Sequence, residues 1–409
     1  MSSKYYFLLG VLIFFSTRIS KSQILTNEDS LAAGLQKQDL TSTYISGYGE
    51  VVVNYDTRNK TAYANLTRNV LFIGHRFSNK INFFSEWELE DAKIEVGEPG
   101  GELALEQMFL KFDMNSNNYI SAGLIIPRIG IINENHLPTT FNSNERPVLE
   151  NILIPSTWRE LGICYYGNSR KMAGLNYSLG LFNGLNSAGF TSGNGIRGGR
   201  FEGKDATASN IAITGSLLYY VGSFRIQAST YIGGSAGLNS RNADSLQLRN
   251  GLFGTPVSLS EANVQCNKNK FSFKLLGTCL VISDAFAINR AYANNTPTVA
   301  WGGYTEFAYN LASTFGIKND KQLNVFARIE FINLNAKIAA NGVENKELEK
   351  IFVFTGLNYK PIRGVCIKFD YRYSKTGIRN ESLNVNPFPT PLPFYQNNSS
   401  VNIGIAYSF

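Results

Sequence analysis

The last nine residues of the chain, 401–409, alternate strictly between large apolar and small or polar side chains. Because successive side chains of a β-strand point to opposite faces, this segment is predicted to form a strand with one apolar and one polar face. Aromatic residues end the apolar face, as they do at a membrane interface. The apolar residues are Val401, Ile403, Ile405, Tyr407 and Phe409. Two folds stay open on this pattern alone: a membrane barrel, or a soluble β-sandwich with a buried last strand.

The overall composition argues against a helical membrane protein and against nucleic-acid binding. The chain of 409 residues is 44% hydrophobic with a mean hydropathy of −0.12. Its 37 glycines and 13% aromatic residues suit many strands and tight turns. Of the net charge of +7, Lys4, Arg18 and Lys21 belong to the leader described next, which leaves +4 for the mature chain. That excess is too small to indicate a nucleic-acid partner.

Residues 1–22 are predicted to be a secretory signal peptide. Lys4 precedes an apolar run over 5–15, and Ser20-Lys21-Ser22 resembles a cleavage site with small residues. The apolar run has 11 residues, whereas a membrane-spanning helix needs about 20. We expect the mature chain to begin near Gln23, with a short periplasmic segment over 23–42.

From residue 43 onward, alternating segments recur between turn-rich stretches, which is typical of transmembrane β-barrels. An even number of strands would place both termini on the periplasmic side. Long connections are expected near 128–158, 183–210, 234–256, 283–298 and 375–398, alternating with short turns. The sixteen predicted strands cover 43–55, 65–77, 81–92, 102–113, 119–127, 159–167, 172–182, 210–220, 223–233, 257–267, 271–283, 298–310, 321–333, 350–360, 364–375 and 400–409.

The number of strands decides which way the apolar faces point. A sixteen-stranded ring is too wide for the side chains of its own strands to fill. The apolar faces are therefore expected to meet lipid, and the polar faces to line a wet interior. The expected fold class is all-β: a transmembrane antiparallel up-and-down β-barrel of about 16 strands over 43–409.

Four cysteines raise the question of disulfides in an exported protein: Cys164, Cys266, Cys279 and Cys366. They lie within strand-like runs, and the hairpin near 267–270 would place Cys266 opposite a residue near Ser272 and not opposite Cys279. We expect all four to be free thiols packed as small hydrophobic residues, because a disulfide requires closely spaced Cα atoms.

Short segments rich in glycine, proline and charged residues follow one another over 101–203. They read GELALEQ at 101–107, AGLIIPRIG at 122–130, NENHLP at 133–138, RP at 146–147, IPSTWRELG at 154–162, NGL at 183–185 and GIRGGR at 195–200. In this order they resemble the porin family related to the phosphate-selective porins O and P, densely over 101–235 and more loosely to the C-terminus. The resemblance implies a sixteen-stranded barrel, commonly a homotrimer, that passes small solutes across the outer membrane of a Gram-negative bacterium. The ending of the chain in 401–409 likewise resembles the signal by which the β-barrel assembly machinery recognises such proteins.

The longest irregular interval, 128–158, is predicted to fold into the barrel and to narrow it. Prolines at 127, 138, 147 and 155 prevent one helix from running through it, and a loop of this length in a compact protein is usually functional. The alternative is an external cap that packs against a neighbouring subunit. The residues expected to line the constriction are Arg128, Arg146, Arg159, Glu134, Glu145 and Glu150.

The charges on the predicted inward faces do not form an anion-selective funnel. The basic residues are Arg225, Arg328, Lys368 and Arg372, and the acidic ones are Glu86, Glu88, Glu90, Glu330 and Asp370. Rings of charge set selectivity in such pores, so phosphate specificity is implied only by the family resemblance. Opposing bands of charge would instead favour zwitterions or peptides.

Two short charged stretches have competing interpretations. Arg197 and Arg200 are expected near the pore mouth, with solvated loop charges as the alternative. Their glycine-rich surroundings lack the strand-to-helix context of a phosphate-binding loop. The run from Glu86 to Glu90 is interpreted as a wet acidic wall, with cation binding as the weaker alternative.

Nothing in the sequence supports catalysis. The chain has two histidines, His75 and His136, and no cluster with metal-ligand spacing. We expect no enzymatic activity, no cofactor and no metal, and for His136 a structural hydrogen bond.

The function favoured by the sequence is that of an outer-membrane porin for passive diffusion of small polar solutes, with anions such as phosphate as one candidate. Expected partners are outer-membrane lipid, these solutes, the assembly machinery and further copies of the chain in a homotrimer. Two alternatives stay open: a structural or ligand-binding barrel with an occluded lumen, and a secreted soluble all-β protein.

Overall fold

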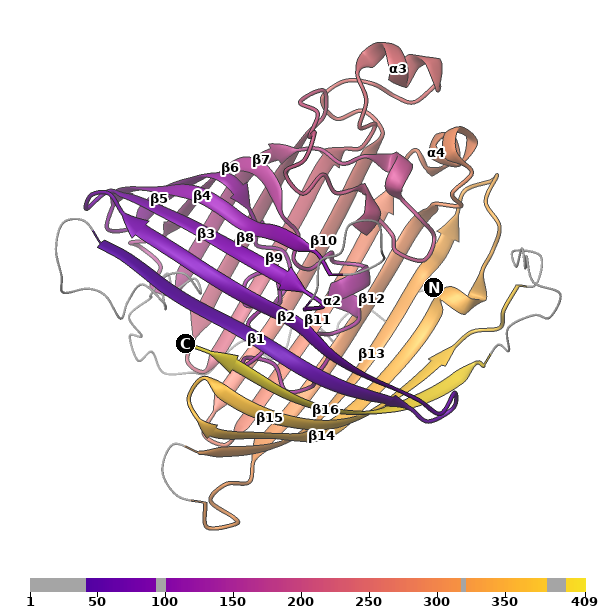
Figure 1. Ribbon diagram of the computed structural model, residues 1–409. Helices are drawn as coiled ribbons and strands as arrows, with labels where there is room; N and C mark the ends of the chain where they lie inside the picture. The colour runs from indigo at the N-terminus through magenta and orange to yellow at the C-terminus, as the bar shows by residue number, and fades with distance from the viewer. Residues whose placement is uncertain (1–41, 93–100, 318–320, 381–394) are drawn as a thin grey trace, which may run out of the picture.

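The computed structural model describes residues 42–92, 101–317, 321–380 and 395–409. Within them, sixteen antiparallel strands form one closed barrel, in which β1 pairs with β16 (Figure 1). The predicted fold class and the number of strands are confirmed, whereas the predicted signal peptide and most of the periplasmic segment lie outside the described residues. The strands are β1 (Ser42–Asp56), β2 (Thr61–Arg76), β3 (Ile81–Glu90), β4 (Leu103–Asn115), β5 (Asn118–Ile125), β6 (Glu160–Asn168), β7 (Leu175–Asn183), β8 (Ile211–Val221), β9 (Phe224–Gly234), β10 (Pro256–Lys268), β11 (Phe271–Ile282), β12 (Pro297–Asn310), β13 (Gln322–Ile338), β14 (Glu349–Ile362), β15 (Val365–Thr376) and β16 (Asn397–Ser408).

The alternation of side chains along the strands follows the membrane-barrel pattern and excludes the soluble sandwich. On β16, Ile403 and Ile405 are about half exposed on the outer face, while Asn402 and Ala406 are buried. On β15, Ile367 and Phe369 face outward, and their neighbours Lys368 and Asp370 are buried inside the ring. An apolar band on the outside of a closed ring is the arrangement that lipid requires.

The connections differ at the two ends of the barrel. Most strands are joined by short turns at one end, such as 222–223 and 269–270, and by longer loops at the other; the short turn 57–60 and the longer connection between β12 and β13 are exceptions. Figure 1 shows the short helices α3 (Ser240–Ser245) and α4 (Ala285–Tyr292) beyond the strands at the long-loop end. Among the described residues, no helix has both the length and the apolar character needed to span a membrane.

All four cysteines are free, as predicted. Cys164, Cys266 and Cys366 are buried, but Cys279 is exposed. The expectation that all four are packed as small hydrophobic residues is therefore wrong for Cys279, which is exposed. It follows the alternation of β11, where Leu280 is buried and Cys279 takes the opposite, outer face.

Replacing Ile403 by Arg should lower the free energy of unfolding by about 2–4 kcal/mol, because the guanidinium would lie in the lipid-facing band. Ile378 offers a matched control: it is 70% exposed, but it lies beyond the end of β15. Ile378→Arg should change the stability by less than about 0.5 kcal/mol. Urea unfolding in lipid vesicles, followed by heat-modifiable gel mobility, measures both variants. Equal losses would contradict an outer band of lipid contact.

Candidate functional site

The connection between β5 and β6, residues 126–159, lies inside the barrel; we call it the inner loop. Its short helix α2 (Leu149–Ile152) contacts β12 and β13, and Leu149 donates its backbone N–H to Glu330 on β13 at 2.9 Å. Trp158 is fully buried, with its ring centroid 4.7 Å from that of Tyr231 on β9. The inward prediction is therefore confirmed, and the external-cap alternative is wrong.

The inner loop makes part of the interior dry. Ile129, Leu153, Ile154 and Trp158 belong to a continuous apolar core that also contains wall residues such as Leu280. The expectation of a wholly wet interior thus needs correction. The side chains of the strands do not fill a sixteen-stranded ring by themselves, but the inner loop fills one side of it.

Buried charges on β12, β13 and β15 fix the loop to the barrel wall. Arg328 lies 2.9 Å from Glu330 and 3.3 Å from Glu306, and it donates a 2.6 Å hydrogen bond to Ser143 of the loop. Lys368 donates to the carbonyl oxygens of Pro138 and Ser143, at 2.6 and 2.9 Å. Unpaired buried charges are costly, so these contacts strongly favour one position of the loop.

Further contacts repeat this arrangement around the wall. Asp370 accepts hydrogen bonds from the backbone and side chain of Asn144, and Arg372 pairs with Glu145 at 2.8 Å. Farther round the wall, Arg225 of β9 pairs with Glu134.

Cavities lie on both sides of the inner loop. The outer vestibule, about 620 Å³, is lined by residues near the long loops, including Glu90, Glu102 and Arg372. The inner vestibule, about 890 Å³, reaches the short-turn end at Arg363 and Ser408. A smaller cavity of about 400 Å³ lies at the same end, beside Arg225.

Most of the predicted lining residues border these cavities. Glu86, Arg128 and Glu134 border the inner vestibule, and Arg225 borders the smaller cavity beside it. The outer vestibule is bordered by Glu88, Glu90, Glu145, Arg146, Arg159, Arg197, Arg200 and Arg372. The predicted lining residues therefore gather mainly around the inner and outer vestibules and do not form one ring.

Three predicted lining residues need correction. Arg328 and Lys368 point inward, but both are about 1% exposed and are occupied in holding the inner loop. Glu150 is fully buried, where its carboxylate accepts from Tyr304 and from the backbone N–H groups of Ile131 and Ile132. Burial raises the pKa of the Glu150 carboxyl to about 7, although these hydrogen bonds act in the opposite direction. All three are anchors of the loop.

The predicted mouth arginines are also held in place. Arg197 donates to the carbonyl oxygens of Asn151 and Ser156, and Arg200 donates to that of Thr157. Burial and the neighbouring guanidinium of Arg200 lower the pKa of Arg197 to about 10. The loop that carries both arginines therefore packs on the inner loop, which excludes the freely solvated alternative.

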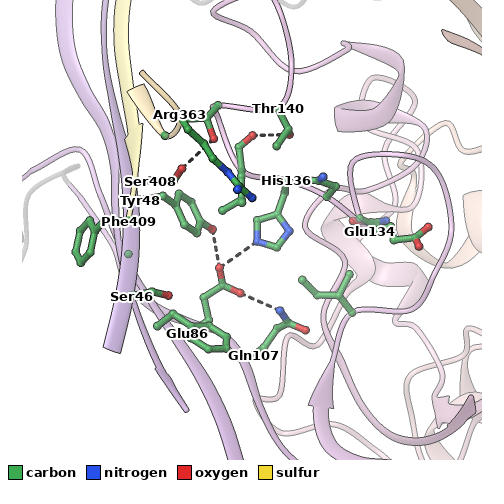
Figure 2. A pocket seen from close by; sticks show the side chains of 18 of the residues that line it. Ser46, Tyr48, Glu86, Gln107, Glu134, His136, Thr140, Arg363, Ser408 and Phe409 are labelled. Carbon is green, nitrogen blue, oxygen red and sulfur yellow. Dashed lines mark hydrogen bonds and ion pairs between the residues drawn. The ribbon is translucent and has the colours of Figure 1, made fainter. Parts of the chain in front are cut away.

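A polar cluster lies between the two vestibules. His136 of the inner loop places Nε2 3.1 Å from Glu86 Oε1 on β3 and 3.5 Å from Glu106 Oε2 on β4. The Tyr48 hydroxyl on β1 donates to both carboxylates, and Figure 2 shows Tyr48, Glu86, Gln107 and His136 pointing toward one another. The predicted hydrogen bond of His136 is confirmed.

The sequence reasoning missed Glu106, because simple alternation fails at that point. The register between β3 and β4 shifts after Glu86, which pairs with Gln107, while Trp87 pairs with Leu105. Glu106 is the extra residue of a β-bulge, so Glu106 and Gln107 are both buried inside. A Glu-Gln pair between Leu105 and Met108 was the available signal.

The chain was compared with protein-family models and with the sequences of known proteins. No protein-family model matches the chain. An uncharacterized protein of Aquifex aeolicus is 28% identical over 341 residues, which cover 80% of this chain and 74% of that protein.

Solved outer-membrane proteins superpose on nearly the whole chain. The outer-membrane channel DcaP of Acinetobacter baumannii has a TM-score of 0.55 at 11% identity and covers 92% of this chain and 99% of its own. An anion-selective porin from Comamonas acidovorans has a TM-score of 0.52 at 10% identity, covering 90% and 100%. The trimer form of OmpT, an outer-membrane protein of Vibrio cholerae, has a TM-score of 0.52 at 10% identity, covering 91% and 100%.

Replacing Arg328 by Met should lower the free energy of unfolding by about 3–5 kcal/mol, because it leaves Glu330 buried without its cationic partner and Glu306 with only Lys274, 3.7 Å away. The double variant Arg328→Met/Glu330→Gln should recover part of this loss. Arg249→Met is the control, since Arg249 is 63% exposed in its pair with Asp284, and it should cost less than about 1 kcal/mol. Urea unfolding in vesicles measures all three. A small effect of Arg328→Met would contradict the anchoring role.

The closed ring, its apolar outer band and these superpositions together show that the chain has the fold of the Gram-negative outer-membrane porins.

Proposed function

We propose that the chain is an outer-membrane porin, a water-filled passage for passive diffusion of small polar solutes. The observation that carries the proposal is the pair of vestibules bordered by ionised residues, one on each side of the inner loop. A barrel that served only as a scaffold would have no need of charged cavities at both ends. The names of the structurally similar proteins, an outer-membrane channel and a porin, support the same function.

The charges bordering the outer vestibule favour weak ion selectivity. Seven are basic and six are acidic: Arg68, Arg146, Arg159, Arg197, Arg200, Lys350 and Arg372 against Glu50, Glu88, Glu90, Glu102, Glu145 and Glu202. Several of these form pairs, such as Arg68 with Glu50 at 2.8 Å and Arg159 with Glu202 at 2.9 Å. Charges of both signs at one constriction suit zwitterionic solutes. Phosphate remains a candidate only through the family resemblance.

We also propose that the chain is related to the phosphate-selective porins, that it forms a homotrimer, and that the assembly machinery recognises residues 401–409. The trimer form of the Vibrio cholerae protein supports a homotrimer. The position of 401–409 in a strand that closes the ring is consistent with a signal read during assembly.

A second candidate is a barrel with an occluded lumen. It is favoured by one observation: the outer and inner vestibules share no lining residue, and the Glu86–Glu106–His136 cluster lies between them. Single-channel recording in planar bilayers separates the candidates, because an occluded barrel shows no open steps.

Deleting residues 133–144 should raise the single-channel conductance severalfold, because this part of the inner loop spans the space between the β3–β4 wall and β13–β15. Deleting 240–251, an equally long piece of the loop that carries α3, should leave the conductance unchanged. Unchanged conductance after the first deletion would contradict a constricting role. Open steps seen only after that deletion would favour the occluded barrel.

In a tenfold KCl gradient, the wild-type channel should give a chloride-to-potassium permeability ratio within about threefold of unity, since basic and acidic residues nearly balance. The reversal potential measures this ratio directly. A strong preference for chloride would instead support an anion-selective, phosphate-type porin.

A further inference from the structure

The cluster between the vestibules joins residues from four parts of the chain. Tyr48 comes from β1, Glu86 from β3, Glu106 from the bulge of β4, and His136 from the inner loop. All four are buried. The two carboxylates and the imidazole therefore meet where the inner loop contacts the barrel wall, beside the inner vestibule, which Glu86 and His136 border.

Two of the three donor-atom separations are close to those around a small metal ion. One donor atom from each of Glu86, Glu106 and His136 lies within 4.8 Å of the other two. From His136 Nε2, the two carboxylate oxygens are 3.1 and 3.5 Å away. Around a tetrahedral zinc ion with bonds of about 2.0–2.2 Å, neighbouring donors lie about 3.3–3.6 Å apart. The three groups can reach one ion with little rearrangement.

The chemistry of the donors selects the type of ion. One imidazole nitrogen and two carboxylate oxygens form a ligand set that zinc and similar divalent transition metals accept. The Tyr48 oxygen or water from the inner vestibule can supply a fourth ligand. Calcium and magnesium, which prefer six or more oxygen ligands, fit this set less well.

Outer contacts hold two of the three ligands in place. Gln107 donates to Glu86 Oε2 at 2.8 Å, and Thr157 donates to Glu106 Oε1 at 2.5 Å. The second oxygen of each carboxylate, Glu86 Oε1 and Glu106 Oε2, is the one that lies near His136. Such supporting hydrogen bonds orient carboxylate ligands and raise metal affinity.

Cations already balance part of the negative charge. Arg68 lies 3.4 Å from Glu88, and Arg146 interacts electrostatically with Glu106. Arg146 is loosely held: it donates to the His136 carbonyl at 3.4 Å, while its Nε has no hydrogen-bond partner among the described residues.

We propose that Glu86, Glu106 and His136 form a binding site for a divalent transition-metal ion of the zinc type. The bound ion ties the inner loop to the β3–β4 wall at the layer between the two vestibules. Where the chain acts as the proposed porin, on which only this consequence rests, zinc lowers the conductance because the bound ion occupies space at the layer between the two vestibules.

The test is equilibrium binding of Zn²⁺ to the folded, metal-stripped barrel without a histidine tag, measured by calorimetry in detergent. We expect one zinc ion per chain and, for His136→Gln, at least about a tenfold loss of affinity. The control is His75→Gln. His75 is the other histidine of the chain, hydrogen-bonded to Thr43 at the short-turn end of β2, and its replacement should leave the affinity unchanged.

A second variant and a spectroscopic readout guard against misfolding. Glu106→Gln should also weaken binding, and heat-modifiable gel mobility verifies that each variant is folded. Co²⁺ should give the intense visible absorption of a four-coordinate site in the wild type and lose it in His136→Gln.

Absence of binding at millimolar Zn²⁺, or equal affinities in the wild type and His136→Gln, would overturn the site. Zinc block of the conductance is recorded separately in bilayers. Binding without any channel would refute the porin and leave the site standing, whereas conductance without binding would refute the site alone.

Discussion

Closure of the ring between β1 and β16 is the constraint on which the rest of the structure depends. In lipid, backbone N–H and C=O groups find no water, so every strand must have two partners. The pairing of β1 with β16 continues to the last residue of the chain, where Gly47 and Phe409 exchange two backbone hydrogen bonds of 3.1 and 2.9 Å. Closure also fixes the faces of all strands: Val51 and Ile405 pair on the outside, and polar residues such as Asn402 turn inward.

The closed ring leaves an interior that the side chains of its strands cannot fill. The inner loop occupies part of this space, and buried charged residues of the wall hold it there. Arg328, Lys368 and Asp370 would be costly inside the barrel if they stood alone. The inner loop satisfies them with Ser143, Asn144 and backbone carbonyl groups. Its apolar residues meanwhile belong to a dry core that also contains wall residues such as Leu280 of β11 and Phe354 of β14. The charged residues that border the vestibules are the ones a solute would meet.

The sequence predicted the strands well and the site only in part, for physical reasons. Period-two alternation is a local property, so all sixteen strands and the inward direction of Arg328 and Lys368 could be read from it. The partners of these residues could not be read from the alternation, because they lie far away in the sequence. Lys368, for example, donates to the carbonyl oxygen of Pro138, 230 positions away. Glu106 was missed because a bulge breaks the alternation. The His136 cluster has no spacing signal, since its members come from separate strands and a loop.

The most direct measurement of the central claim, an inner loop fixed across an open barrel, is the conductance of a cross-linked channel. Thr139 of the loop and Ser408 of β16 have their hydroxyl oxygens 3.1 Å apart, so cysteines at these positions, with the four native cysteines replaced, should form a disulfide on oxidation. The account predicts that the bond forms readily and that the single-channel conductance is the same before and after oxidation. Failure to cross-link, or a severalfold change in conductance when the bond forms, would contradict it.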